Sequence, residues 1–140
     1  MRTLLKNGLI ADGSGKPLYK ADVLLSGNVI EKIAENVVAE DAEIVDCTGL
    51  IVAPGFIDAH SHNDFFYDYP DAEKFYRPFL RQGITTQITG NCGFSPFGIA
   101  ADSKFKDKVG GGLFHAKNPG SFKEFVSSAE GNLFVNVVPL

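Results

Sequence analysis

Short apolar runs separated by glycine-containing turns fill the first third of the chain. Residues 3–12 and 21–35 are such runs, and residues 26–28 (Ser-Gly-Asn) interrupt the second one as a hairpin turn would. Residues 43–55 predict a further pair of strands. Because the runs are short and glycines are frequent, we predict that residues 1–53 form a β-rich segment without a helix of three or more turns.

The pattern changes after Pro54, where runs of strand and helix periodicity alternate. Pro78 lies inside the first helical run, so it either kinks that helix or begins a second short one. Ser121 and Glu124 have the spacing of a capping box at the start of the second helix. A β-α-β-α-β order predicts parallel strands. The five runs are residues 55–62, 70–83, 84–91, 121–131 and 132–138.

Two histidines one residue apart close the first of these strands. If the strand continues through them, His60 and His62 share one face, with Asp58 below them on the same face. Two imidazoles so placed can bind one divalent metal such as zinc, and the carboxylates of Asp58 and Asp64 can orient the rings. The alternative is a solvated polar turn, which is the more common fate of such a pair. Three roles remain open for Asp64: it supports the metal ligands from behind, it contacts the substrate, or it is simply a polar residue of the turn.

The stretch "APGFIDAHSHND", residues 53–64, resembles the signature at the first barrel strand of the amidohydrolase superfamily. The resemblance implies an α/β fold in which residues 1–53 are a small β-sandwich segment. Residues 54–140 would then be the first β-α-β-α-β part of a metal-dependent (β/α)8 barrel. It also implies that His60 and His62 are metal ligands.

A second stretch, "GITTQITGNCGFSPFG" at residues 83–98, resembles the second strand of the D-aminoacylases within that superfamily. The resemblance makes the thiolate of Cys92 a metal ligand, and zinc binds thiolates well. The alternative is that Cys92 is a small buried apolar residue. We interpret Cys47 as structural. His115, in the glycine-rich connection over residues 97–120, is either a substrate-contacting or an exposed loop residue, and we favour the second.

Composition narrows the possible partners. The net charge is −4 and no basic stripe is present, so we expect no nucleic-acid partner. No apolar run approaches the roughly 20 residues that cross a bilayer, and the N-terminus is a poor signal peptide, so we expect no membrane partner. Two cysteines do not form a disulfide framework. These features favour a cytoplasmic protein with reduced thiols.

The resemblance implies a metal-dependent hydrolase of linear amide bonds that converts N-acyl-D-amino acids to a carboxylate and a D-amino acid. One or two divalent ions, zinc above all, would activate the attacking water. The family's catalytic aspartate lies on a later strand, and no residue of this chain matches it. Since a closed barrel needs roughly 250 residues, we expect an N-terminal fragment that is inactive without the remainder of a parent chain. Its oligomeric state is open.

Two other functions remain possible. The first is a cyclic amidohydrolase of the hydantoinase or dihydroorotase type, which resembles this chain at the histidine pair but usually carries a lysine on a later strand in place of Cys92. The second is a non-catalytic metal-binding module.

Overall fold

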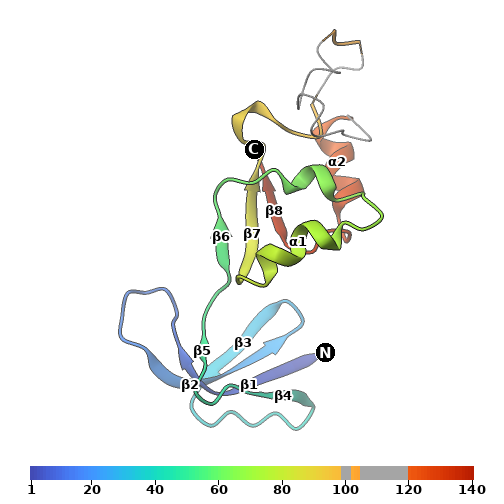
Figure 1. The fold of residues 1–140 in the computed structure, drawn as a ribbon. Coiled ribbons are helices and arrows are strands. Elements are labelled where there is room, and N and C mark those ends of the chain that lie inside the picture. Colours follow the sequence, from blue (N-terminus) through green and yellow to red (C-terminus); the bar gives the residue numbers. More distant parts are fainter. Residues whose placement is uncertain (99–101, 105–119) are drawn as a thin grey trace. The chain divides into compact units, whose positions relative to one another are not determined.

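The computed structural model describes residues 1–98, 102–104 and 120–140, which divide into two compact units, Met1–Pro54 and Gly55–Leu140 (Figure 1). The glycine run of the long connection and His115 lie outside the described residues. Strands and helices combine into a mixed α/β fold. The elements are β1 (Arg2–Ile10), β2 (Tyr19–Ser26), β3 (Val29–Ala34), β4 (Ala42–Asp46), β5 (Ile51–Val52), β6 (Phe56–Asp58), η1 (Asn63–Phe66), α1 (Glu73–Leu80), β7 (Ile84–Thr89), η2 (Asn91–Gly93), α2 (Phe122–Ala129) and β8 (Asn136–Pro139).

The first unit is one five-stranded sheet in the order β3-β2-β1-β4, with β5 also paired to β1. The hairpin between β2 and β3 is confirmed, and Gly27 at its turn has a φ of 58°. The absence of a helix is also confirmed for residues 1–54, all of which are described. The β-sandwich itself stays a prediction, because this unit contains a single layer.

The expected pairing of the two strands within residues 43–55 is wrong. Strands β4 and β5 both pair in parallel with β1, one after the other along the same edge, and not with each other. The backbone N–H of Cys47 donates to the carbonyl of Lys6 at 2.7 Å, which keeps the connection beside β1 where a hairpin would fold it back. Gly8 allows the close approach, since a Cβ there would lie 2.6 Å from Cγ2 of Val52.

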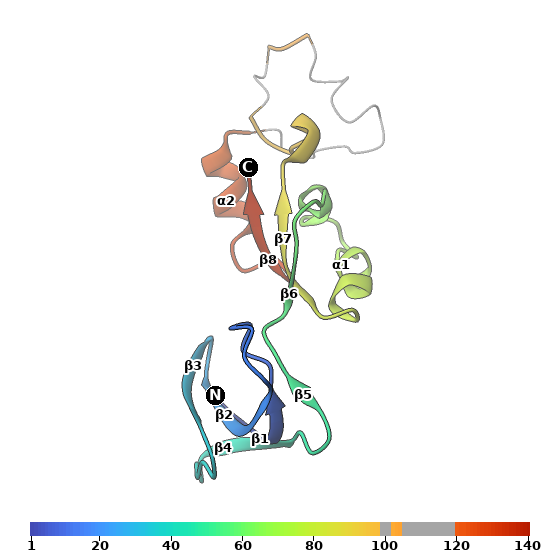
Figure 2. The ribbon, with the colours of Figure 1, turned by 90° about the vertical axis from the view of Figure 1, so that its left-hand side faces the viewer.

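The second unit contains three parallel strands in the order β6-β7-β8, joined by α1 and α2 (Figure 2). The predicted β-α-β-α-β order is therefore confirmed. All three strands are shorter than predicted, since β6 ends at Asp58, β7 ends at Thr89 and β8 begins at Asn136. At the end of β6 the carboxylate of Asp58 accepts the backbone N–H of His60 at 3.1 Å. This local bond turns the chain out of the strand.

The two helices settle the questions raised by their sequences. Helix α1 continues through Pro78, which lies in its last turn and lacks the N–H that would bond to the carbonyl of Lys74. Helix α2 has the predicted capping box, in which Ser121 and Glu124 each accept the other's backbone N–H. No helix in the described part of the chain is long and apolar enough to cross a membrane.

The core of the second unit consists of two apolar clusters. In one, Tyr76 of α1 packs with Ala72 and Val135. In the other, the α2 residues Phe125 and Ala129 pack against Tyr67. Leu133 contacts both clusters. The helices are thereby fixed to the chain segments that lead into β8 and out of η1.

Candidate metal centre

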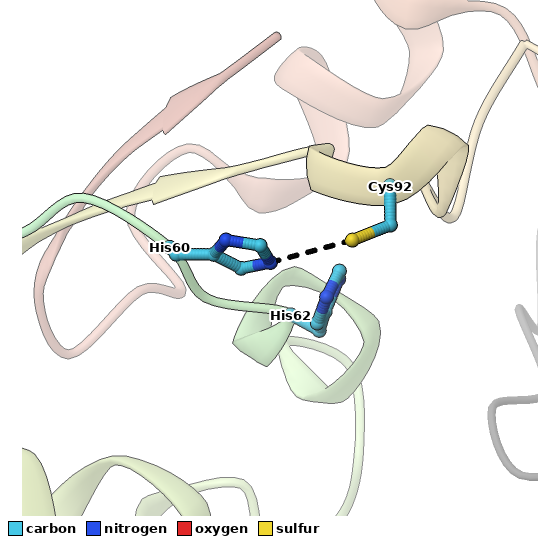
Figure 3. A group of neighbouring side chains, drawn as sticks. All are labelled: His60, His62 and Cys92. Carbon is cyan, nitrogen blue, oxygen red and sulfur yellow. Dashed lines mark hydrogen bonds between the residues drawn. The ribbon is translucent and has the colours of Figure 1, made fainter.

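His60, His62 and Cys92 come together at one end of the parallel sheet. His60 lies two residues beyond β6, and His62 immediately precedes η1. Cys92 lies in η2, just beyond the end of β7. Because β6 and β7 are parallel neighbours, the segments that leave their carboxyl ends emerge side by side. Figure 3 shows the three side chains pointing toward one another.

The three potential ligand atoms lie close together, and one of their distances equals that expected between two ligands of one zinc ion. The Sγ of Cys92 lies 3.5 Å from Nε2 of His60, and the three potential ligand atoms all lie within 4.8 Å of one another. Zinc bonds of about 2.0–2.3 Å in a tetrahedron separate ligand atoms by about 3.3–3.8 Å. The imidazole–thiolate donor set suits zinc. His60 and Cys92 are exposed and His62 is half-buried, so an ion could reach the cluster from solvent.

The strand expected to carry both histidines does not extend to them. It ends at Asp58, so the alternation of faces along a strand is not what brings the rings together. The ring centroids of His60 and His62 lie 5.4 Å apart at an interplanar angle of 76°. The prediction of strand geometry is wrong, because the bond from Asp58 to the His60 backbone bends the chain first.

Cys92 has an unusual backbone conformation. Its φ of 60° and ψ of 14° lie in the left-handed region, which costs a residue with a Cβ about 1–2 kcal/mol. Gly90, which leads into this turn, also has a positive φ, and a Cβ there would meet the carbonyl oxygen of Leu140 at 2.7 Å. Backbone strain of this kind is frequent at active sites and ligand-binding sites.

We predict that replacing Cys92 with glycine stabilises the metal-free protein. Relief of about 1–2 kcal/mol of strain outweighs about 0.5–1 kcal/mol of added unfolded-state entropy. The net gain should be a few tenths of a kcal/mol to about 1 kcal/mol in urea unfolding without metal. Cys92→Ala is the matched control, because it removes the thiol but keeps the Cβ and its strain. A Cys92→Gly protein less stable than Cys92→Ala would contradict the prediction.

A buried polar layer is made of Asn63 and Asp64, which follow His62 in the chain, and of Gln87 and Thr89 on β7. All four residues are less than 10% exposed. The side-chain amide of Asn63 donates to Oε1 of Gln87 at 3.2 Å. The hydroxyl of Tyr76 donates to the Asn63 carbonyl at 2.7 Å. The sequence analysis missed this layer. Its signal was the polar residue at every second position of β7, where Gln87 and Thr89 share one face.

Burial governs the ionisation of this layer. It raises the pKa of Asp64 to about 6, and the nearby Thr89 hydroxyl opposes part of that rise. The two groups are not within hydrogen-bonding geometry, and neither Asp64 oxygen has a hydrogen-bond partner among the described residues. Burial also raises the pKa of Tyr76, and the charge of Asp64 adds to this effect. Asp64 is therefore a buried carboxyl group of this layer, whereas the Asp58 carboxylate accepts the backbone N–H of His60.

Known proteins resemble this chain in sequence and in fold. No family profile matches the chain. A D-aminoacylase from Alcaligenes xylosoxydans xylosoxydans is 42% identical over 92 residues, covering 66% of this chain and 18% of that enzyme. A dihydroorotase from Streptococcus thermophilus is 49% identical over 59 residues, covering 42% of this chain and 14% of that enzyme.

A solved N-acyl-D-glutamate deacylase from Bordetella bronchiseptica, complexed with zinc and a phosphonate inhibitor, superposes with a TM-score of 0.75. It is 27% identical, and the match covers 99% of this chain and 28% of that chain. The described fold therefore resembles one segment of that deacylase. The chain spans less than a third of the length of each of these relatives.

Proposed function

Because this chain resembles the D-aminoacylases of the amidohydrolase superfamily in sequence and in fold, we propose that it serves a metal-dependent hydrolase of linear amide bonds. The substrates are N-acyl-D-amino acids, and the products are a carboxylate and a free D-amino acid. The observation that carries this proposal is the convergence of His60, His62 and Cys92 within 4.8 Å. In this reading, residues 1–53 are the β-sandwich segment and residues 54–140 begin the (β/α)8 barrel.

Each of the three side chains has a distinct part in the proposed centre. His60 and His62 supply neutral imidazole nitrogens, and Cys92 supplies a thiolate that must lose its proton for binding. Zinc, when bound, supplies a Lewis acid that polarises the amide carbonyl and lowers the pKa of water. The exposed His60 and Cys92 leave the solvent side of the cluster open to a small-molecule substrate. An acid–base aspartate would come from a later strand of the barrel.

The two carboxylates near the histidines have supporting roles. Asp58 holds the turn that presents His60, through the backbone N–H that it accepts. Asp64 is fully buried, which favours a role behind the ligands over contact with substrate.

The test is an amidase assay on the natural protein that contains this sequence. Zinc-loaded protein should release free amine from N-acetyl-D-amino acids and much less from the L-enantiomers. Removal of zinc with a chelator should abolish this release, and added zinc should restore it. His60→Ala is expected to lose activity in step with bound zinc. D-selective release that persists in fully metal-free protein, or none in zinc-loaded protein, would refute the proposal.

Opening of a cyclic amide is the second candidate function. It is supported by the 49% identity to a dihydroorotase, although that match covers only 42% of this chain. Dihydroorotate and hydantoins assayed in parallel distinguish the two. The stretch around Cys92, which resembles the D-aminoacylases, favours the linear substrate.

A further inference from the structure

The loop that carries the histidines is attached to β7 at successive points. The backbone N–H of Ser61 donates to the carbonyl of Ile88 at 2.9 Å. One step deeper, Asn63 donates to Gln87 at 3.2 Å, and both side chains are buried. Strand β7 then leads directly into the turn that holds Cys92. The same strand thus anchors the histidine loop and presents the cysteine.

Gln87 lowers the stability of the folded protein compared with an apolar residue that would pack equally well at this position. It is 0% exposed, and its Nε2 has no hydrogen-bond partner among the described residues. A buried amide that is only partly satisfied is destabilising compared with an apolar side chain of similar size. The bond that its oxygen accepts from Asn63 is the one feature of Gln87 that an apolar residue could not supply.

Asn63 is well placed to transmit this restraint. It directly follows His62 in the chain, and its own carbonyl accepts the hydroxyl of Tyr76 from α1. Its side chain also reaches the carbonyl of Phe75 at 3.5 Å. The residue next to His62 is therefore fixed from the helix on one side and from β7 on the other.

We propose that the buried Asn63–Gln87 hydrogen bond positions the histidine loop on β7 so that His60 and His62 meet Cys92. Asn63 and Gln87 act as positioning residues, since neither belongs to the cluster itself. The inference rests on the proposed function only for the identity of the ion. Groups that orient metal ligands typically contribute 10–100-fold to metal affinity.

The experiment titrates the full chain with Co²⁺, whose absorption reports both ligand geometry and the thiolate bond. Gln87→Met removes the acceptor and the unpaired amide at nearly constant volume. It leaves the Asn63 amide with only its bond to the Phe75 carbonyl, so the two effects on the free energy of unfolding oppose each other, and the protein should stay folded. Asn63→Ala removes the donor, and the double variant completes a cycle. The matched control is Asn136→Ala, which removes an exposed bond from β8 to the Thr85 carbonyl of β7, away from the histidine loop.

We expect Gln87→Met to weaken Co²⁺ affinity about 10-fold or more and to shift the cobalt spectrum. The double variant should bind Co²⁺ as tightly as whichever single variant has the lower affinity. Asn136→Ala should have the Co²⁺ affinity of the unmodified protein. Additive losses in the double variant, or a folded Gln87→Met protein with unaltered affinity and spectrum, would overturn the proposal.

A metal-free measurement separates this inference from the proposed function. Hydrogen exchange of the Ser61 amide reports how firmly the loop is held on β7. If the unmodified protein binds no Co²⁺, the metal assignment fails, and exchange then decides the positioning role alone. Faster Ser61 exchange in Gln87→Met, with Asn136→Ala unchanged, supports it; equal exchange in all three proteins refutes it.

Discussion

Replacing Cys92 with serine is expected to weaken zinc binding by at least ~100-fold, beyond the usual effect of losing a residue that only orients ligands. A zinc-bound thiol is deprotonated and contributes both charge and a soft donor. A serine hydroxyl of nearly the same size contributes neither at neutral pH. The Sγ of Cys92 lies 3.5 Å from Nε2 of His60, so the thiolate is already in place beside the imidazole. The substitution therefore removes a ligand without any need for His60 to move.

The second cysteine provides the matched control for this prediction. Cys47 is buried in the first unit, where its Sγ lies 3.8 Å from the Val45 carbonyl. Cys47→Ser should therefore lower the free energy of unfolding and leave zinc affinity unchanged. The measurement is a competition titration at pH 7 against a zinc-binding dye, with unfolding curves for both variants. Equal zinc affinity in the two variants would show that Cys92 is not a ligand.

Replacing Tyr76 with alanine is expected to destabilise the protein by about 3–5 kcal/mol, the range for truncating a buried aromatic residue. The ring is 0% exposed and packs between Ala72 and Val135. Its hydroxyl also donates to the Asn63 carbonyl at 2.7 Å. Tyr76→Phe keeps the ring and leaves that buried carbonyl without its donor, so we expect a smaller loss of about 1–3 kcal/mol.

Urea unfolding followed by circular dichroism measures both losses. Phe56→Ala is the control for aromatic truncation at an open site, since its ring is 68% exposed, and it should cost less than about 1 kcal/mol. If Tyr76→Ala cost no more than Phe56→Ala, the cluster around Tyr76 would not be the core of this unit. A Tyr76→Phe protein as stable as the unmodified one would remove the argument for the Asn63 bond.

Local periodicity sufficed for the type and order of the elements in the second unit because its signals act over a few residues. The capping box at Ser121 and Glu124 and the β-α-β-α-β order are examples, and both are present. Strand ends were harder to predict. The run that ends in His60 and His62 looks like continuous strand, yet one side-chain bond from Asp58 ends it early. The prediction that the strands of residues 43–55 pair with each other was also wrong, because β4 and β5 both pair with β1.

The sequence by itself determined which side chains offer metal-binding chemistry, because residue type and the family-like stretches around His60 and Cys92 are local properties of the chain. Only the tertiary structure decided that they lie within 4.8 Å of one another, since that depends on the parallel pairing of β6 with β7 and on a turn strained at Cys92. The buried hydrogen bond between Asn63 and Gln87 is likewise a feature that only the tertiary structure decides. Residues 24 positions apart meet there through packing, which no short stretch of sequence encodes.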